Sequence, residues 1–176
     1  MSAIRVAVLW CAAVGAMACA PHRHAAPLSP EPAVGIDERQ LLLARRQADS
    51  LQVVIASLAV FKAVDPDVRR LAETLVRDHM YTMDEIDAIA RTARTARHDR
   101  SRMAPIVGHF AQMAPGPEFD AAFVDTVLAA HHHDAAERKR LLPWIGDMLR
   151  SVLESSQPML DLHLRLAEAV KRGIGR

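Results

Sequence analysis

The chain has 176 residues, 51% of them hydrophobic and 24% charged, a length that suits one domain with a core and is short for two. Its formal net charge of +1 gives no strongly basic surface, so we expect no nucleic-acid partner. The two cysteines are Cys11 and Cys19, and every later position is therefore excluded from disulfides and thiolate metal sites.

Residues 1–18 have the pattern of a secretory signal peptide. MSAIR supplies a positive charge, and VAVLWCAAVGAMA is an apolar run too short to span a membrane. The following AMAC resembles a bacterial lipobox with Ala16 in place of the usual leucine, which predicts lipidation of Cys19. The same residues also suit ordinary signal peptidase, so a soluble periplasmic protein is the alternative.

Residues 19–36 are predicted to form an extended tether. This segment contains four prolines and little that could pack. A tether of this kind suits a domain held to a membrane by a lipid anchor. We therefore favour an outer-membrane lipoprotein on the periplasmic side of a bacterial envelope.

From Asp37 onwards, apolar residues recur at steps of three and four, which predicts an all-α domain over residues 37–172. The predicted helices cover about residues 38–61, 66–97, 117–142 and 147–171. Asp37 is the expected N-cap of the first, and Asp65 with Pro66 opens the second. Four helices, each about 37 Å long, favour a four-helix bundle.

Two features interrupt this simple pattern. The connection between the second and third helices is long and contains a short predicted helix at residues 104–113. It either folds back locally or crosses the length of the bundle, as in ferritin-like folds. Pro158 lies inside the fourth helix, where it predicts a kink rather than a break.

Three histidines lie in the middle of apolar stripes: His79, His131 and His163, on the second, third and fourth helices. One core histidine is usually structural, but three on facing stripes favour a cluster. A crossover that makes the second and third helices parallel puts His79 level with His131. Antiparallel third and fourth helices leave His163 about 7 Å off that level, which predicts a loose cluster.

Asp134 follows His131 by one helical turn and shares its face. With the three histidines it would complete a site with three imidazoles and one carboxylate, suited to zinc, copper or iron. The alternative interpretation is that Asp134 is a solvated residue paired with Arg138. In the run HHHD, only His131 joins the inward stripe, because successive helical residues point about 100° apart.

The sequence lacks the known catalytic patterns. No glutamate is followed by a histidine three residues later, as di-iron carboxylate bundles require. It also contains no nucleophile elbow, phosphate-binding glycine loop or HExxH. We therefore expect a non-enzymatic protein.

A basic face is predicted at the end of the second helix, formed by Arg91, Arg94 and Arg97. It is either a solvated face that complements the helix dipole or a patch for anionic lipid phosphates.

Three stretches together resemble one protein family: LAETLVRDHMYTMDEI, EFDAAFVDTVLAAH and QPMLDLHLRLAEAV. The family is domain-of-unknown-function family 4142, whose members are labelled putative outer membrane proteins and regarded as ferritin-like. The resemblance covers Asp37 to Val170 and implies a ferritin-like fold and an envelope location. The family pattern has a glutamate in the first helix where this chain has Gln52, which removes one candidate ligand and counts against iron oxidation.

Three functions are therefore compared. The first is an envelope-anchored, non-enzymatic lipoprotein that acts by interaction with envelope proteins or by stress protection. The second is a metal-binding bundle that uses the core histidines, and the third is a metal-dependent enzyme.

Overall fold

The computed structural model describes residues 37–90 and 103–174, and its helices all belong to one compact unit within residues 35–176. Every element in the described ranges is helical, which confirms the predicted all-α class. The elements are α1 (Glu38–Lys62), α2 (Pro66–Ala90), α3 (Ala104–Gln112), α4 (Pro117–Leu141), the 3-10 helix η1 (Leu142–Trp144), α5 (Asp147–Ser155) and α6 (Gln157–Ile174). The predicted signal peptide, Cys19, the predicted tether and the arginines at 91, 94 and 97 lie outside the described residues.

The first two helices begin where the capping residues predict. Asp37 Oδ1 accepts hydrogen bonds from the backbone N–H groups of Arg39 and Gln40, at 3.1 and 3.2 Å. Asp65 Oδ1 accepts from the N–H of Asp67 at 2.7 Å, with Pro66 at the first helical position. Each aspartate satisfies N–H groups that have no partner inside the helix.

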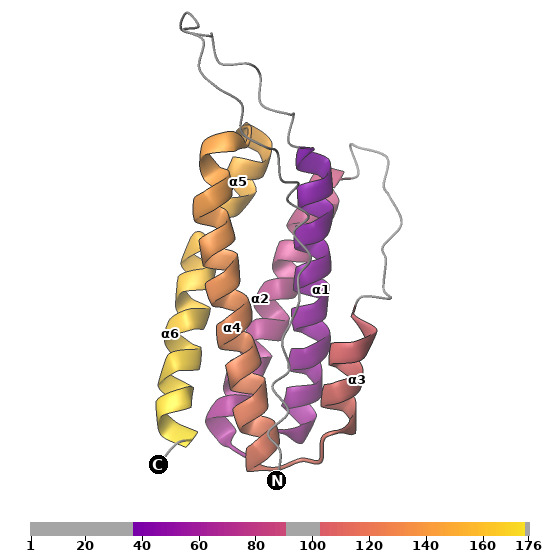
Figure 1. Cartoon of the computed structure of the whole chain (residues 1–176), viewed down its shortest axis with the longest axis vertical. Helices are drawn as coiled ribbons and strands as arrows, with labels where there is room; N and C mark the ends of the chain where they lie inside the picture. Colours follow the sequence, from indigo (N-terminus) through magenta and orange to yellow (C-terminus); the bar gives the residue numbers. More distant parts are fainter. Residues whose placement is uncertain (1–36, 91–102, 175–176) are drawn as a thin grey trace, which may run out of the picture. The chain divides into compact units, whose positions relative to one another are not determined.

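The helices pack into a bundle in which α1 lies along α2 and α4 along α6 (Figure 1). Further contacts join α2 to α6 and α1 to α4. None of the described helices is both long enough and apolar enough to span a membrane.

The direction of α4 follows from one buried carboxylate. Asp120, in the first turn of α4, accepts hydrogen bonds from the N–H groups of Val64 and Asp65 at 3.3 and 2.8 Å. The start of α4 therefore lies at the turn between α1 and α2, so α2 and α4 run in the same direction. The chain between Ala90 and Pro117 has to return to this end of the bundle, and α3 packs on α1 along the way. Of the two predicted alternatives, the structure has the crossover.

The core consists of two apolar clusters. The larger contains Ile55, Leu71, Leu75, Phe110, Phe119, Phe123 and Val127 among its buried residues. The smaller contains Leu42, Ile86, Ile145, Leu149, Val152 and Leu153. Between them along the helices lies a polar layer, which we define as Arg45, Asp49, Asp78, His79, Thr82, His131, Asp134, Arg138, Ser156 and His163.

The apolar stripe of the first helix is only partly buried. With its steps of three and four residues it includes Ala44 and Ala48 and predicts that both face the core, but both are exposed. Asp49 is buried instead, with 1% of its surface exposed. The inward face of α1 therefore carries a carboxylate into the polar layer.

The fourth predicted helix is divided at Ser156 rather than kinked, which corrects the expectation from Pro158. α5 ends at Ser155 and α6 begins at Gln157, because proline has no N–H to continue the helical hydrogen bonds and its ring crowds the preceding turn. Arg138 of α4 stabilises the division: its Nη1 donates to the carbonyl of Leu153 at 2.6 Å and to Ser156 Oγ at 3.0 Å. A buried guanidinium thus binds a carbonyl at the end of α5.

Candidate metal centre

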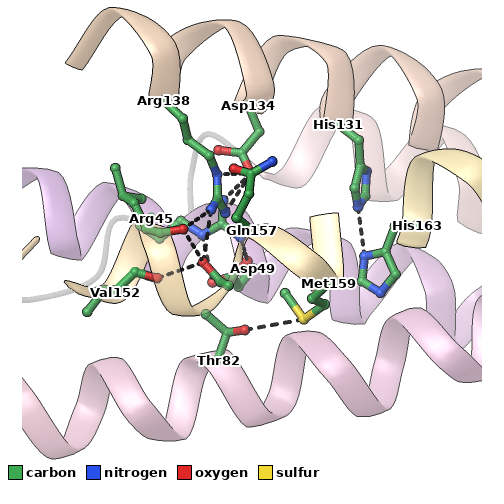
Figure 2. A network of polar contacts seen from close by, with 12 residues as sticks. Arg45, Asp49, Thr82, His131, Asp134, Arg138, Val152, Gln157, Met159 and His163 are labelled. Carbon is green, nitrogen blue, oxygen red and sulfur yellow. Dashed lines mark hydrogen bonds and ion pairs between the residues drawn. The ribbon is translucent and has the colours of Figure 1, made fainter. Parts of the chain in front are cut away.

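Three buried histidines from three helices converge in the polar layer. They are His79 of α2, His131 of α4 and His163 of α6, and each exposes 3% or less of its surface. One ring nitrogen from each lies within 4.8 Å of the other two. The structure therefore brings together the three histidines singled out in the sequence, and Figure 2 shows two of them, His131 and His163, facing each other.

The cluster is tighter than the helix positions predicted. His79 is the fourteenth residue of α2 and His131 the fifteenth of α4, so parallel helices put them level. The expected 7 Å offset of His163 is wrong, since its Nδ1 lies 3.1 Å from His131 Nε2. The offset was counted along one continuous helix, whereas the structure has two helices, α5 and α6, divided at Ser156.

On the side away from the cluster, His79 and His131 each donate an N–H to an oxygen. His79 Nδ1 lies 2.8 Å from Asp49 Oδ1, and His131 Nδ1 lies 2.9 Å from the carbonyl oxygen of Val127. Because these oxygens accept, both Nδ1 atoms carry the hydrogen. In a neutral ring, Nε2 then presents a lone pair, and the outer contact fixes this tautomer, as it does for metal-bound histidines.

His163 connects the cluster to a carboxylate at the edge of the bundle. Its Nε2 lies 3.0 Å from Asp78 Oδ2, and Asp78 also accepts from Arg77 Nε at 2.8 Å. Although burial opposes it, the hydrogen bonds from Arg77 and His163 hold the pKa of Asp78 below its ordinary value. An ionised Asp78 favours the tautomer in which His163 Nε2 carries the hydrogen and Nδ1 presents a lone pair.

The row of contacts through His131 and His163 needs three hydrogens, but the two neutral rings carry only two. Val127 O, His131, His163 and Asp78 are joined by three contacts of 2.9, 3.1 and 3.0 Å. Two neutral imidazoles bring only two N–H groups. In the tautomers that satisfy Val127 and Asp78, two lone pairs face each other across the 3.1 Å contact between the rings.

Burial keeps these two rings neutral. It lowers the pKa of His131 to about 3 and the pKa of His163 to about 4, with the neighbouring imidazoles adding to the effect. At neutral pH a proton therefore does not supply the missing hydrogen. A metal cation that accepts the lone pairs of His131 Nε2 and His163 Nδ1 would suit this contact instead.

His79 supplies a third ring nitrogen whose lone pair accepts no hydrogen bond. Its Nε2 is buried and has no hydrogen-bond partner. Leaving a buried acceptor unsatisfied costs about 1–3 kcal/mol. Two imidazole lone pairs that face each other and a third without a partner are what a metal ion would use.

Asp134, the fourth residue of the predicted ligand set, lies in an ion-pair cluster instead. It binds Arg138 Nη2 at 3.1 Å and forms a closer ion pair with Arg45 (Figure 2). Although burial opposes it, the two guanidiniums hold the pKa of Asp134 below its ordinary value. Among the described residues, the group that could hold a metal contains the three histidines without Asp134. The expected pair with Arg138 is present, but Asp134 is only 24% exposed and so is not the solvated residue of the alternative interpretation.

The sequence interpretation missed Asp49. Arg45 holds it from both sides, with Nη2 at 3.0 Å from Oδ1 and Nε at 3.2 Å from Oδ2. The carboxylate that the first helix provides therefore stands at position 49 and not at position 52. Arg45 and Asp49 are four residues apart, a spacing typical of a surface ion pair, so the pattern gave no sign that both side chains point inward.

Comparison with known families finds a match over most of the chain. The model of the family described as Domain of unknown function (DUF4142) matches residues 23–170. The chain belongs to the DUF4142 family. No curated protein and no solved structure matches it. The function of this DUF4142 chain therefore has to be argued from its own residues.

Proposed function

We propose that this DUF4142 protein is a transition-metal-binding helical bundle whose ligands are His79, His131 and His163. One observation carries the proposal: three buried ring nitrogens converge while the opposite nitrogen of each ring meets an oxygen. Outer contacts of this kind orient metal-binding histidines. Imidazole nitrogen is a ligand for zinc, copper and iron.

The spacing of the nitrogens is compatible with direct ligation. Metal–nitrogen bonds of 2.0–2.1 Å at a tetrahedral centre place two ligand nitrogens about 3.3 Å apart. The contact between His131 Nε2 and His163 Nδ1 is 3.1 Å. His79 Nε2, which has no hydrogen-bond partner, is the third donor.

The proposal includes the architecture and the location. α1, α2, α4 and the α5–α6 pair form a four-helix bundle of the ferritin-like type, supported by the crossover between α2 and α4. Holding a reactive metal ion in a buried site is a form of stress protection, which agrees with the non-enzymatic role expected from the sequence. The lipobox-like AMAC and the proline-rich segment support an envelope lipoprotein.

The lipid anchor has its own test. Replacing Cys19 by serine removes the thiol that would be lipidated, so we expect the variant to leave the membrane fraction and appear in the soluble periplasmic fraction. Cys11→Ser, in the apolar run, is the matched control and keeps the wild-type distribution. Membrane association that is unchanged in Cys19→Ser contradicts the lipoprotein.

The metal site is tested with full-length protein made without a histidine tag. Cys11 and Cys19 are both replaced by serine so that no thiolate competes. We expect one metal ion per chain by elemental analysis after incubation and dialysis, and an increase in the melting temperature with added metal. His131→Ala is expected to lower the affinity at least about 100-fold, as expected when one of three ligands is lost.

His132→Ala is the matched control, because His132 is the exposed neighbour of His131. This variant is expected to bind metal as the parent does. If zinc, copper and iron all fail to bind stoichiometrically or to raise the melting temperature, the proposal is wrong.

A further inference from the structure

The charges around the three histidines limit which cation the site can hold. An imidazole that binds a metal ion through its lone pair brings no charge, so an ion bound by three of them keeps its full charge in a buried place. The polar layer contributes three carboxylates, Asp49, Asp78 and Asp134, and two guanidiniums, Arg45 and Arg138. Its surplus is one negative charge.

The unbalanced negative charge is that of Asp78. Arg45 and Arg138 share Asp49 and Asp134 in direct ion pairs. The arginine partner of Asp78 is Arg77, whose side chain is 71% exposed, so water and salt screen its charge. Asp78 itself contacts the ligand His163.

A single positive charge therefore balances the site, whereas a divalent ion leaves an excess. The cost of burying an ion rises with the square of its charge, so it is about fourfold larger for a divalent than for a univalent cation. A divalent ion would have to bring an anion such as hydroxide with it.

The number of ligands also favours a univalent cation. Among the residues that the structure describes, the metal-ligand group contains three histidines and no carboxylate or cysteine. Asp134, the nearest candidate for a fourth ligand in the sequence, is held by two arginines. Zinc on three histidines completes its tetrahedron with a water or hydroxide, whereas univalent copper is complete with three nitrogen ligands.

We infer that the site selects univalent copper, Cu(I), over divalent zinc. This inference rests on the proposed function, since it assigns the ion to the same three histidines. Alkali cations have the right charge but prefer oxygen ligands. Divalent copper is not an informative comparison, because it binds most nitrogen sites more tightly than zinc does.

The test compares Cu(I) and Zn(II) on the tag-free full-length chain with Cys11→Ser and Cys19→Ser. Cu(I) is titrated without oxygen against the chromophoric chelator bicinchoninate, and Zn(II) against 4-(2-pyridylazo)resorcinol, both at pH 7. We expect one Cu(I) per chain, bound at least about 100-fold more tightly than Zn(II). Silver, Ag(I), is a redox-inert univalent probe and is expected to compete for the Cu(I) site.

Two variants connect the result to the residues. His131→Ala is expected to lower the Cu(I) affinity at least about 100-fold, whereas His132→Ala retains the parent affinity. Zn(II) that binds as tightly as Cu(I), or more tightly, overturns the inference and leaves the proposed metal site standing. If neither ion binds, the inference fails, and the proposed function fails with it if iron does not bind either.

Discussion

Replacing Arg45 by methionine is expected to lower the free energy of unfolding by about 3–5 kcal/mol, because the substitution leaves a buried carboxylate without its partner. Arg45 binds both oxygens of Asp49, which is 1% exposed, and also pairs with Asp134. Although burial opposes it, these two carboxylates raise the pKa of Arg45 above its ordinary value. A loss of this size is a large part of the 5–15 kcal/mol that stabilises a typical domain. Urea denaturation followed by circular dichroism measures it.

A double variant separates the ion pair from the metal site. Arg45→Met with Asp49→Leu removes both charges, and replacing a buried pair by apolar residues is often neutral for stability. We expect most of the lost stability to return. Metal affinity is still expected to fall about 10–100-fold, since His79 Nδ1 no longer has its acceptor.

Arg70→Met on α2 is the control for the loss of an exposed ion pair. Arg70 and Asp67 are 67% and 63% exposed, so the expected change is within about 1 kcal/mol. A loss as small as this in Arg45→Met would show that the buried pair contributes no more than a surface pair.

Lowering the pH from 6.5 to 5 is expected to destabilise the metal-free protein by about 3 kcal/mol, about 1.5 from each of two histidines. The pKa of His131 is lowered to about 3 and the pKa of His163 to about 4, against about 6.5 in the unfolded chain. Between these values the unfolded state binds more protons, so stability falls as the pH falls. The slope from each histidine rises from about half of 1.4 kcal/mol per pH unit at pH 6.5 to nearly all of it at pH 5.

The measurement is urea denaturation at pH 7, 6.5, 6 and 5 in the presence of a chelator. His131→Gln is expected to halve the slope, and His132→Ala to leave it unchanged. The carboxylates of Asp78 and Asp134, whose pKa values are lowered, contribute only below about pH 4 and do not enter this range. A flat profile between pH 7 and 5 would falsify the neutral, buried state of the two rings.

Much of the fold could be predicted from local patterns. Aspartate caps and the proline at position 66 mark where helices begin, because they act within one turn of the chain. The three histidines could be predicted as core residues for a similar reason, since each stands in an apolar stripe with a period of 3.6 residues.

The rest depends on contacts between segments far apart in sequence. Asp49 forms the spacing of a surface ion pair with Arg45, and only the positions of His79 and Asp134 draw both side chains inward. The division at Ser156 depends on Arg138, which approaches from another helix. In both cases the deciding partner lies on another helix, so the sequence of one helix alone does not reveal it.

The polar layer also determines the alignment of the helices along the bundle axis. A shift of one helix by a single turn, about 5.4 Å, would move a carboxylate or guanidinium into one of the two apolar clusters, where it has no partner. One alignment therefore satisfies the charges, and the same alignment brings the three imidazoles together. The fold thus preorganises the three imidazoles, and the proposed metal ion would meet a site whose geometry has already been selected.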